Sequence, residues 1–308
     1  MLQRRLIHPY KSNDFITKNF KLLMCFRNYW FSYRNILLRS IQKKNYLAFV
    51  RKIFGTFYKF IVRFIRNNFS SRVTNLDNLD KKHYFDLDLD NLFINFNCDK
   101  GSYCIWDDKK ILSHNYSIFY EKYFSRFKKK EINILELGSH EGKGIASFYF
   151  YFPYSNIIGA NINPFQMRFT SNRITELYTD VSSKRILFNL SNHLREEFDI
   201  IIDDASHNLR DILIAFVTLF RKIKKGGIYV IEDMDQFKTF KELNPYTNEL
   251  TPKEILHKIK NKEDFHSSFI NQEEKEYLVE NIKDIKVEKG FMEINNNNVS
   301  DIAFIFKK

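Results

Sequence analysis

Residues 199–208 read DIIIDDASHN, and this stretch decides the fold. Its three consecutive isoleucines predict a strand that is buried on both faces, the pattern typical of parallel sheets covered by helices. Two carboxylates, Asp203 and Asp204, and the histidine His207 follow directly. Because burying a charge without a partner is costly, we expect these side chains to face a cleft, a metal ion or each other.

The alternation of apolar strand, turn and helix continues on both sides of that stretch. We expect a helix at 165–178 and further strands at INILELG (132–138), NIIGANI (156–162), RILFN (185–189) and GGIYVIED (226–233). Strands that alternate with helices predict a parallel sheet with helices on both faces. Two last strands, within 282–294 and 299–308, have no helix between them and are expected to be antiparallel. The predicted fold is therefore α/β, with a mostly parallel seven-stranded sheet and an antiparallel C-terminal strand.

Ligands of open α/β sheets bind beyond the carboxyl ends of the strands, so the residues after each strand are candidate site residues. The first strand ends in ELGSHEGKG, whose glycines permit a tight turn and close approach of the backbone to a ligand. The second ends at Asn161, where nucleoside-binding folds usually place an acid for the ribose hydroxyls. Asp180, followed by Val181 and Ser182, is a candidate for the adenine edge, although a lone aspartate in a turn is also a common cap.

Length and cysteine content limit the kinds of protein that this can be. A chain of 308 residues with 44% hydrophobic residues can bury a large core. Its three cysteines lack CxxC spacing and fit neither a disulfide framework nor a zinc site, which favours a reducing, cytoplasmic location. The longest uncharged run, 144–167, contains Pro153 and Pro164, so we expect a helix, a turn and a strand there and no transmembrane segment.

The first 72 residues differ in charge from the rest of the chain. They hold 16 Lys and Arg against one acid, Asp14, whereas the other 236 residues hold 33 basic and 36 acidic residues. Over 46–68, basic and apolar side chains fall on opposite sides of a helical wheel, which predicts a basic helical N-terminal extension with an amphipathic helix. Three interpretations stay open: a helix docked on the core, peripheral contact with an anionic membrane, and nucleic-acid binding.

Residues 70–97 are rich in Asn and Asp, and the sign of the charge changes there. The DLDLD stretch lacks the glycine and the terminal glutamate of a calcium loop, so we expect a solvated connector. A helix is expected near 116–127. The expected organisation is an extension (1–72), a connector with a helical segment (73–130), and the domain that contains the sheet (131–308).

The order LELGSHEGKG, IIGANI, TDVSS, FDIIIDDASH and KKGGIYVIEDMD resembles the class I S-adenosylmethionine-dependent methyltransferases. Within them it is most similar to the metal-dependent sugar O-methyltransferases of macrolide biosynthesis, the macrocin and mycinamicin type. The resemblance covers roughly residues 96–308, and its most specific parts are DASH and the ED after GGIYVI. It implies a Rossmann-like methyltransferase fold, S-adenosylmethionine as cofactor and Mg²⁺ as metal.

By position, the resemblance implies metal ligands at Asp204, Glu232 and Asp233 and a general base at His207. The cofactor-binding positions that we expect are Glu136, Gly138, Ser139, Gly142, Asn161, Asp180, Val181 and Ser182. CDKGSY and SHNYSIFY match the family's segment that borders the cofactor, which adds Lys100, His114 and Tyr116. Asn161 departs from the family's pattern, and loss of a charge-assisted hydrogen bond to the ribose is expected to weaken cofactor binding.

The residue types are consistent with this chemistry. Three carboxylates from two strand ends form a hard oxygen set suited to Mg²⁺, which lowers the pKa of a bound hydroxyl. His207, three residues after Asp204, can then take the hydroxyl proton. The competing interpretation is that Asp203, Asp204 or His207 caps the helix that follows, but it leaves Glu232 and Asp233 unexplained.

We therefore expect a Mg²⁺-dependent O-methyltransferase that acts on a hydroxyl of a sugar or glycosylated small-molecule acceptor. One alternative is an RNA methyltransferase that uses the basic arm to bind phosphates, and another is a non-enzymatic membrane-associated protein with a degenerate cofactor fold. The slightly acidic catalytic part argues against a nucleic-acid partner. The expected location is the cytoplasm, with peripheral contact at the inner membrane surface through residues 1–72, and a homo-oligomer is left open.

Overall fold

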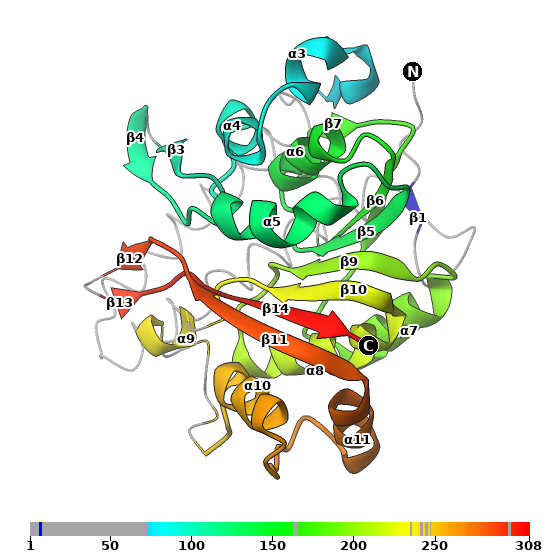
Figure 1. Cartoon of the computed structure of the whole chain (residues 1–308), viewed down its shortest axis with the longest axis vertical. Coiled ribbons are helices and arrows are strands. Elements are labelled where there is room, and N and C mark those ends of the chain that lie inside the picture. The colour runs from blue at the N-terminus through cyan, green and yellow to red at the C-terminus, as the bar shows by residue number, and fades with distance from the viewer. Residues whose placement is uncertain are drawn as a thin grey trace, which may run out of the picture.

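The computed structural model describes residues 6–7 and 73–308, except 107, 163–165, 235, 241–242, 244–245, 247 and 295–296. Its centre is a twisted sheet with helices on both faces (Figure 1). The amphipathic helix predicted over 46–68 lies outside the described residues. Of the predicted N-terminal extension, the structure describes the two-residue strand β1 (Leu6–Ile7), which pairs in parallel with the edge of the sheet.

The sheet has the strand order β1-β8-β6-β5-β9-β10-β14-β11. Its strands are β5 (Ile132–Leu137), β6 (Ser155–Asn161), β8 (Ile174–Tyr178), β9 (Phe198–Asp203), β10 (Ile223–Ile231), β11 (Ile282–Lys289) and β14 (Asp301–Lys307), with β1 at one edge. β14 is antiparallel to both of its neighbours, and the other pairings in this sheet are parallel. The predicted mostly parallel sheet with an antiparallel C-terminal strand is confirmed, and β1 extends the seven predicted strands to eight.

Helices bury both faces of the sheet. One face packs against α4 (Leu89–Asn95), α5 (Ser117–Phe124) and α6 (Lys143–Tyr151), and the other against α7 (Lys184–His193), α8 (Leu209–Leu219), α10 (Pro252–Asn261) and α11 (Gln272–Asn281). Alternate residues of β9 show this. Ile200 and Ile202 belong to the hydrophobic cluster on the side of α4, α5 and α6, and Ile201 belongs to the cluster on the side of α7 and α8. The run of isoleucines is therefore explained by burial on both faces.

Two elements were predicted in the wrong order: the structure has a strand where a helix was expected, and a helix where a strand was expected. The predicted helix at 165–178 is wrong, because 169–170 form β7 (Phe169–Thr170) and 174–178 form β8. The β-branched residues Ile174 and Thr175 favour a strand, and a turn precedes them. The predicted strand RILFN is also wrong: it lies in α7, where Ser183 caps the helix by accepting a hydrogen bond from Ile186 N.

Residues 73–97, which were predicted to lie in a solvated connector, pack on the sheet instead. Leu76, Leu89, Leu92 and Phe93 are buried in the same hydrophobic cluster as α6. The DLDLD stretch supplies a cap instead of a calcium loop, since Asp88 accepts a hydrogen bond from Asn91 N at the start of α4. The predicted helix at 116–127 is confirmed as α5 followed by one 3-10 turn.

The remaining elements are short. They are the strands β2 (Thr74–Asn75), β3 (Tyr103–Trp106), β4 (Lys109–Leu112), β12 (Glu293–Ile294) and β13 (Asn297–Asn298), and the helices α3 (Lys81–Phe85) and α9 (Gln236–Thr239). β3 pairs with β4 and β12 with β13, which gives two hairpins outside the main sheet. The uncharged run 144–167 contains most of α6, a turn and β6, as predicted. Within the described part of the chain, no helix combines the length and the hydropathy needed to span a bilayer.

Candidate active site

The turn after β5 brings the candidate cofactor residues together. Glu136 is buried, burial raises the pKa of its carboxyl to about 7, and its Oε2 atom has no hydrogen-bond partner among the described residues. Gly138 and Gly142 have φ angles of +83° and +79°, a region that L side chains rarely adopt. The carbonyl of buried Ser139 accepts a hydrogen bond from Gly142 N at 2.7 Å, which closes the turn. An unpaired buried carboxylate oxygen beside a tight glycine turn fits a polar ligand.

This turn lies directly against a candidate metal ligand. A Cβ atom on Gly138 would lie 1.9 Å from the carbonyl oxygen of Asp204. Asp204 N in turn donates a hydrogen bond to the Leu137 carbonyl at 3.0 Å, which continues the pairing of β5 with β9. The candidate cofactor turn and the candidate metal site are therefore parts of one site at the carboxyl ends of adjacent strands.

His207 points toward the candidate metal ligands from the loop after β9. Its Nε2 atom lies 3.6 Å from Asp204 Oδ1 and 3.9 Å from Asp233 Oδ2. The cap of α8 is Asn208, whose side chain accepts a hydrogen bond from Arg210 N, so the interpretation of Asp203, Asp204 or His207 as the cap is wrong. His207 and Asp233 both have a positive φ, 52° and 53°, and such strain in non-glycine residues clusters at functional sites.

Asp203 is separated from this group although it precedes Asp204. The Tyr229 hydroxyl donates a hydrogen bond to Asp203 Oδ2 at 3.4 Å, and Tyr229 belongs to the hydrophobic cluster that includes α8. Burial raises the pKa of Asp203 to about 8. Of the two consecutive carboxylates in DIIIDDASHN, Asp204 is therefore the one that lies with the site residues.

Lys100 lies at the centre of the carboxylates. Its Nζ atom is 2.5 Å from Asp204 Oδ2, 2.7 Å from Glu232 Oε2 and 3.6 Å from Glu136 Oε1. Burial opposes a charge on this lysine, but Asp204 and Glu232 hold its pKa well above the ordinary value. Lys100 was predicted to border the cofactor, and the structure places its ammonium between the candidate cofactor residue Glu136 and two candidate metal ligands.

His114 and Tyr116 meet at the carboxylate of Asp233. His114 Nδ1 lies 3.2 Å from Asp233 Oδ1, and the Tyr116 hydroxyl donates a hydrogen bond to the same oxygen at 2.5 Å. Burial lowers the pKa of His114, but the charge of Asp233 outweighs it and raises that pKa to about 9. For Asp233 the opposite holds: burial raises its pKa, and His114 lowers it to about 2. The pair is therefore ionised at neutral pH.

The donor atoms and the charge of the site fit a divalent cation. Asp204, His207 and Asp233 each offer a ligand atom within 4.8 Å of the others. Four carboxyl groups, those of Glu136, Asp204, Glu232 and Asp233, surround two cationic side chains, Lys100 and His114, so acidic groups outnumber basic ones at the site. Glu232, the third predicted metal ligand, is not among the three residues that offer these ligand atoms. Both of its carboxylate oxygens accept hydrogen bonds from Lys100.

The residues predicted at the ribose and the adenine lie at the ends of β6 and β8. Asn161 is buried, and its amide nitrogen is 3.5 Å from both the His140 carbonyl and Gln166 Oε1. Asp180 Oδ1 accepts hydrogen bonds from the backbone N and the hydroxyl of Ser182, at 3.1 and 2.6 Å, which is the turn-forming role considered above. Val181 packs against the hydrophobic cluster that includes α7 and α8. Their contact with a cofactor stays a prediction.

Two contacts of the candidate site were not predicted from the sequence. The Tyr120 hydroxyl donates a hydrogen bond to Glu232 Oε1, and Gln236 Nε2 donates one to Asp233 Oδ2 at 2.7 Å. Tyr120 could have been found, because it lies four residues after Tyr116 and shares its helix face. Nothing in the sequence around Gln236 distinguishes it from an ordinary polar residue of a loop.

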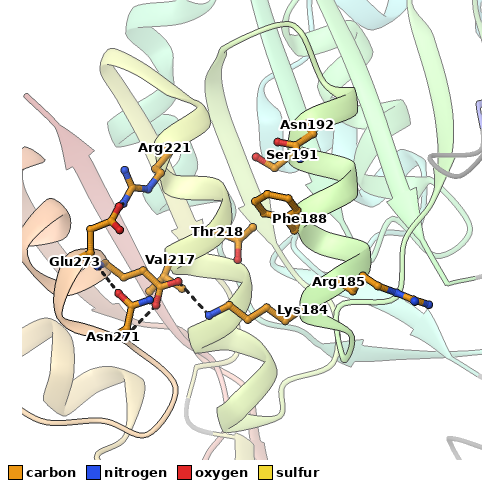
Figure 2. A pocket seen from close by; sticks show the side chains of 11 residues that line it. Lys184, Arg185, Phe188, Ser191, Asn192, Val217, Thr218, Arg221, Asn271 and Glu273 are labelled. Atoms are coloured by element: carbon orange, nitrogen blue, oxygen red, sulfur yellow. Dashed lines mark hydrogen bonds and ion pairs between the residues drawn. The ribbon is translucent and has the colours of Figure 1, made fainter.

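A cavity of about 500 Å³ lies elsewhere, between α7, α8 and the start of α11 (Figure 2). Four of its charged lining residues pair with each other: Lys184 Nζ lies 3.1 Å from Glu274 Oε1, and Arg221 Nη2 lies 3.0 Å from Glu273 Oε1. None of the candidate site residues lines it. The chemistry of the chain is therefore assigned to the strand ends rather than to this cavity.

The known proteins whose sequences match this chain are all named as O-methyltransferases. The chain is 34% identical over 134 residues to the 8-demethyl-8-(2-methoxy-alpha-L-rhamnosyl)-tetracenomycin-C 3'-O-methyltransferase of Streptomyces olivaceus, which covers 41% of this chain and 34% of that protein. It is 28% identical over 128 residues to the mycinamicin VI 2''-O-methyltransferase of Micromonospora griseorubida, which covers 39% of this chain and 32% of that protein. The matches thus span about a third of the length of these relatives. No family model matches the chain.

The fold is shared with a solved methyltransferase. MycE from the mycinamycin biosynthetic pathway, crystallised with Mg, SAH and mycinamycin VI, superposes with a TM-score of 0.53 at 21% sequence identity, over 72% of this chain and 54% of MycE. The chain therefore has the Rossmann-like methyltransferase fold, and the comparisons confirm the resemblance to sugar O-methyltransferases that its motifs indicate.

Proposed function

We propose that the protein is a metal-dependent O-methyltransferase that methylates a sugar hydroxyl of a glycosylated acceptor. The observation that carries the proposal is the contact of the Gly138 turn with Asp204, because it joins a candidate cofactor turn to a pair of carboxylates and a histidine. Relatives named as O-methyltransferases of rhamnosyl tetracenomycin and of mycinamicin VI support the sugar acceptor. The RNA and non-enzymatic alternatives gain no support from these relatives.

The residues divide into three roles. Glu136 and the turn from Gly138 to Gly142 would hold S-adenosylmethionine, which supplies the methyl group and a sulfonium charge that neighbouring carboxylates favour. Asp204 and Asp233 would hold Mg²⁺, which lowers the pKa of a bound hydroxyl. Glu232, the third ligand implied by the resemblance, is proposed to join them on release from Lys100. His114, Tyr116 and Gln236 orient Asp233 through their contacts with its carboxylate.

His207 is the proposed general base. In the transfer, the acceptor oxygen forms a bond to the methyl carbon, the carbon–sulfur bond breaks, and His207 Nε2 takes the hydroxyl proton. The imidazole is about one-fifth exposed, so it can reach an acceptor, and its Nε2 atom lies beside Asp204 and Asp233. Lys100 neutralises part of the acid cluster and so keeps its carboxylates close together.

The test is methyl transfer from radiolabelled S-adenosylmethionine to α-L-rhamnosides, with Mg²⁺ or with a chelator. Rhamnosides are chosen because one relative is named for a rhamnosyl substrate. We expect labelled glycoside with Mg²⁺ and a loss of at least tenfold with the chelator. Calorimetry that detects no S-adenosylmethionine binding with or without Mg²⁺ would overturn the proposal.

We also propose, from the sequence alone, that residues 1–72 make peripheral contact with an anionic membrane in the cytoplasm. The presence of 16 basic residues against one acid supports this proposal. Flotation of the full chain with phosphatidylserine and phosphatidylcholine vesicles is the measurement. Binding that needs phosphatidylserine and weakens with salt is expected, and equal binding to both vesicles would contradict it.

A further inference from the structure

Exposed apolar side chains gather on the β3–β4 hairpin. Among the described residues, the two most exposed large hydrophobic side chains are Leu112, at 81%, and Trp106, at 68%, and Ile105 is 55% exposed. The hairpin is a separate two-stranded sheet that projects to one side of the molecule, past α4 and α5 (Figure 1). Exposed apolar side chains that cluster in this way mark a binding surface.

The tip of the hairpin carries apolar side chains on both faces. Residues paired directly across antiparallel strands lie on the same face, and successive residues of a strand alternate between the faces. Ile105 therefore shares one face with its partner Lys110 and with Leu112, whereas Trp106 shares the opposite face with its partner Lys109. A ligand held against one face would leave an apolar side chain of the other face in water. The occupant of this surface therefore has to surround the tip.

Hydrogen bonds hold the hairpin in its projecting position. The side chain of Asn97, just after α4, accepts a hydrogen bond from Ile105 N at 2.6 Å and donates one to the Ile105 carbonyl at 3.0 Å. At the base, the carboxylate of Asp90 accepts hydrogen bonds at 2.7 Å from the backbone N and the hydroxyl of Ser102. Because the backbone is already ordered, binding through the tip loses little conformational entropy.

The residue types at the tip are those of an interfacial membrane contact. Tryptophan is enriched at the level of the lipid headgroups, and a lysine beside it can rest its apolar stem on the hydrocarbon while its ammonium reaches the phosphates. Lys109 and Lys110 are both exposed, each directly opposite one of the two apolar side chains at the tip. Trp106 and Ile105 with these lysines therefore match the surface of a bilayer.

Two acids in the connection between the strands limit how deeply the tip can enter. Asp107 and Asp108 follow Trp106 directly, and their charges balance those of Lys109 and Lys110. Removing carboxylates from water is costly, so the tip should stop at the headgroup region, where the acids stay hydrated. Because the hairpin has no net charge, its attraction to a membrane should be hydrophobic and insensitive to salt.

We propose that the β3–β4 hairpin inserts Trp106 and Ile105 into the headgroup region of a phospholipid bilayer. A bilayer surrounds an inserted tip, so it covers the apolar side chains of both faces at once. The inference does not rest on the proposed methyl transfer, because it involves none of the candidate site residues. It adds a hydrophobic contact to the electrostatic contact proposed for residues 1–72, and the two differ in their response to salt.

The first experiment measures whether Trp106 touches lipid. The sequence holds two tryptophans, Trp30 and Trp106, so Trp30→Phe in the full chain leaves Trp106 as the reporter. The probe is vesicles of equal parts phosphatidylcholine and phosphatidylserine, with or without bromine on the acyl chains near the headgroups. We expect the emission to shift to shorter wavelength and to be quenched by the brominated lipid. Added salt should lower the fraction of protein bound but not the quenching of each bound molecule.

The second experiment measures what the tip contributes to binding. Ile105→Ser with Trp106→Ser should reduce partitioning into the same vesicles roughly tenfold in flotation. Phe188→Ser is the matched control, because Phe188 is 59% exposed but lies on α7, on the other face of the sheet, and it should partition like the wild type. Equal thermal midpoints of the variants would show that the fold is kept.

Three results would overturn the inference. The first is protein that floats with vesicles while Trp106 stays unquenched, or that binds no vesicle at all. The second is unchanged partitioning of the double variant. The third is a shift of the Trp106 emission with protein concentration in the absence of lipid, which would assign the tip to a second copy of the chain. Quenching by vesicles of phosphatidylcholine alone would support the hairpin contact and count against the anionic contact of residues 1–72.

Discussion

The ammonium of Lys100 lies 2.7 and 2.8 Å from the two carboxylate oxygens of Glu232, although 132 residues separate them in the sequence. Both side chains are 3% exposed, so this ion pair is shielded from water. Asp204 and Glu136 lie around the same ammonium. Removing one partner of a buried pair leaves the other charge without compensation, which costs about 3–5 kcal/mol.

We therefore predict that Lys100→Met lowers the free energy of unfolding by about 3–5 kcal/mol, because three carboxylates lose their common cation. Lys307→Met is the matched control. Lys307 is also buried, but its Nζ atom donates hydrogen bonds to the carbonyls of Arg221 and Ile223 and not to carboxylates. Denaturant unfolding in the presence of a chelator measures both variants. If Mg²⁺ restores no more stability to Lys100→Met than to Lys307→Met, the acid cluster is not a cation site.

The His114–Asp233 pair predicts a pH dependence of stability. The pKa of His114 is about 9 in the folded protein against an ordinary value of 6.5, so its contribution is fully present below pH 6.5 and is lost as the pH rises through 9. The stability difference between wild type and His114→Asn should shrink by up to about 3 kcal/mol between pH 6 and 9.5. Unfolding with a chelator present, at several pH values, measures it. A difference that stays constant with pH would show that His114 is neutral.

We predict that the substitution Asn161→Asp increases the affinity for the cofactor. If the ribose lies at the end of β6, Asn161→Asp adds a charge-assisted hydrogen bond and should tighten S-adenosylmethionine binding by roughly 1–2 kcal/mol. Calorimetric titration is the measurement, with Asn172→Asp, an exposed position, as the control for added charge. Weaker binding by Asn161→Asp would show that the amide holds something other than the ribose.

The carboxylates should differ in their effect on metal binding. Asp204→Asn and Asp233→Asn are each expected to weaken Mn²⁺ binding tenfold or more, because both offer oxygens beside His207. Glu232→Gln should cost less, since the energy of separating Glu232 from Lys100 and Tyr120 offsets part of what it contributes as a ligand. Mn²⁺ titration followed by electron paramagnetic resonance decides the order. An equal loss for all three would mean that Glu232 binds the metal without that cost.

The sequence predicted the strand ends better than the contacts between them. β5, β6, β9 and β10 were found because each is a short apolar run followed by a turn, and a parallel sheet places those turns at one edge. The positions of β8 and α7 were exchanged, because both are short segments that mix apolar and polar residues, so that helical and strand periodicities overlap.

The position of Lys100 could not be predicted in the same way. The motif CDKGSY marks it as a site residue, but its contacts with Asp204 and Glu232 join segments more than 100 residues apart. Such contacts depend on how α4 and α5 pack on the sheet, which no local pattern encodes. The burial of Leu76 and Leu89 was missed for the same reason, because an Asn and Asp-rich segment gives no sign of the partner that covers its few apolar residues.

We propose that His207 takes the acceptor proton, a claim that is tested by the single-turnover rate of methyl transfer by His207→Ala at saturating Mg²⁺ and S-adenosylmethionine. Loss of a general base typically costs about 10²- to 10⁴-fold in rate, so we predict a fall of that order, with Mn²⁺ affinity and the thermal midpoint nearly unchanged. Transfer at the wild-type rate would contradict the claim. A loss of Mn²⁺ affinity parallel to the loss of rate would also contradict it, because His207 would then be a metal ligand beside Asp204 and Asp233.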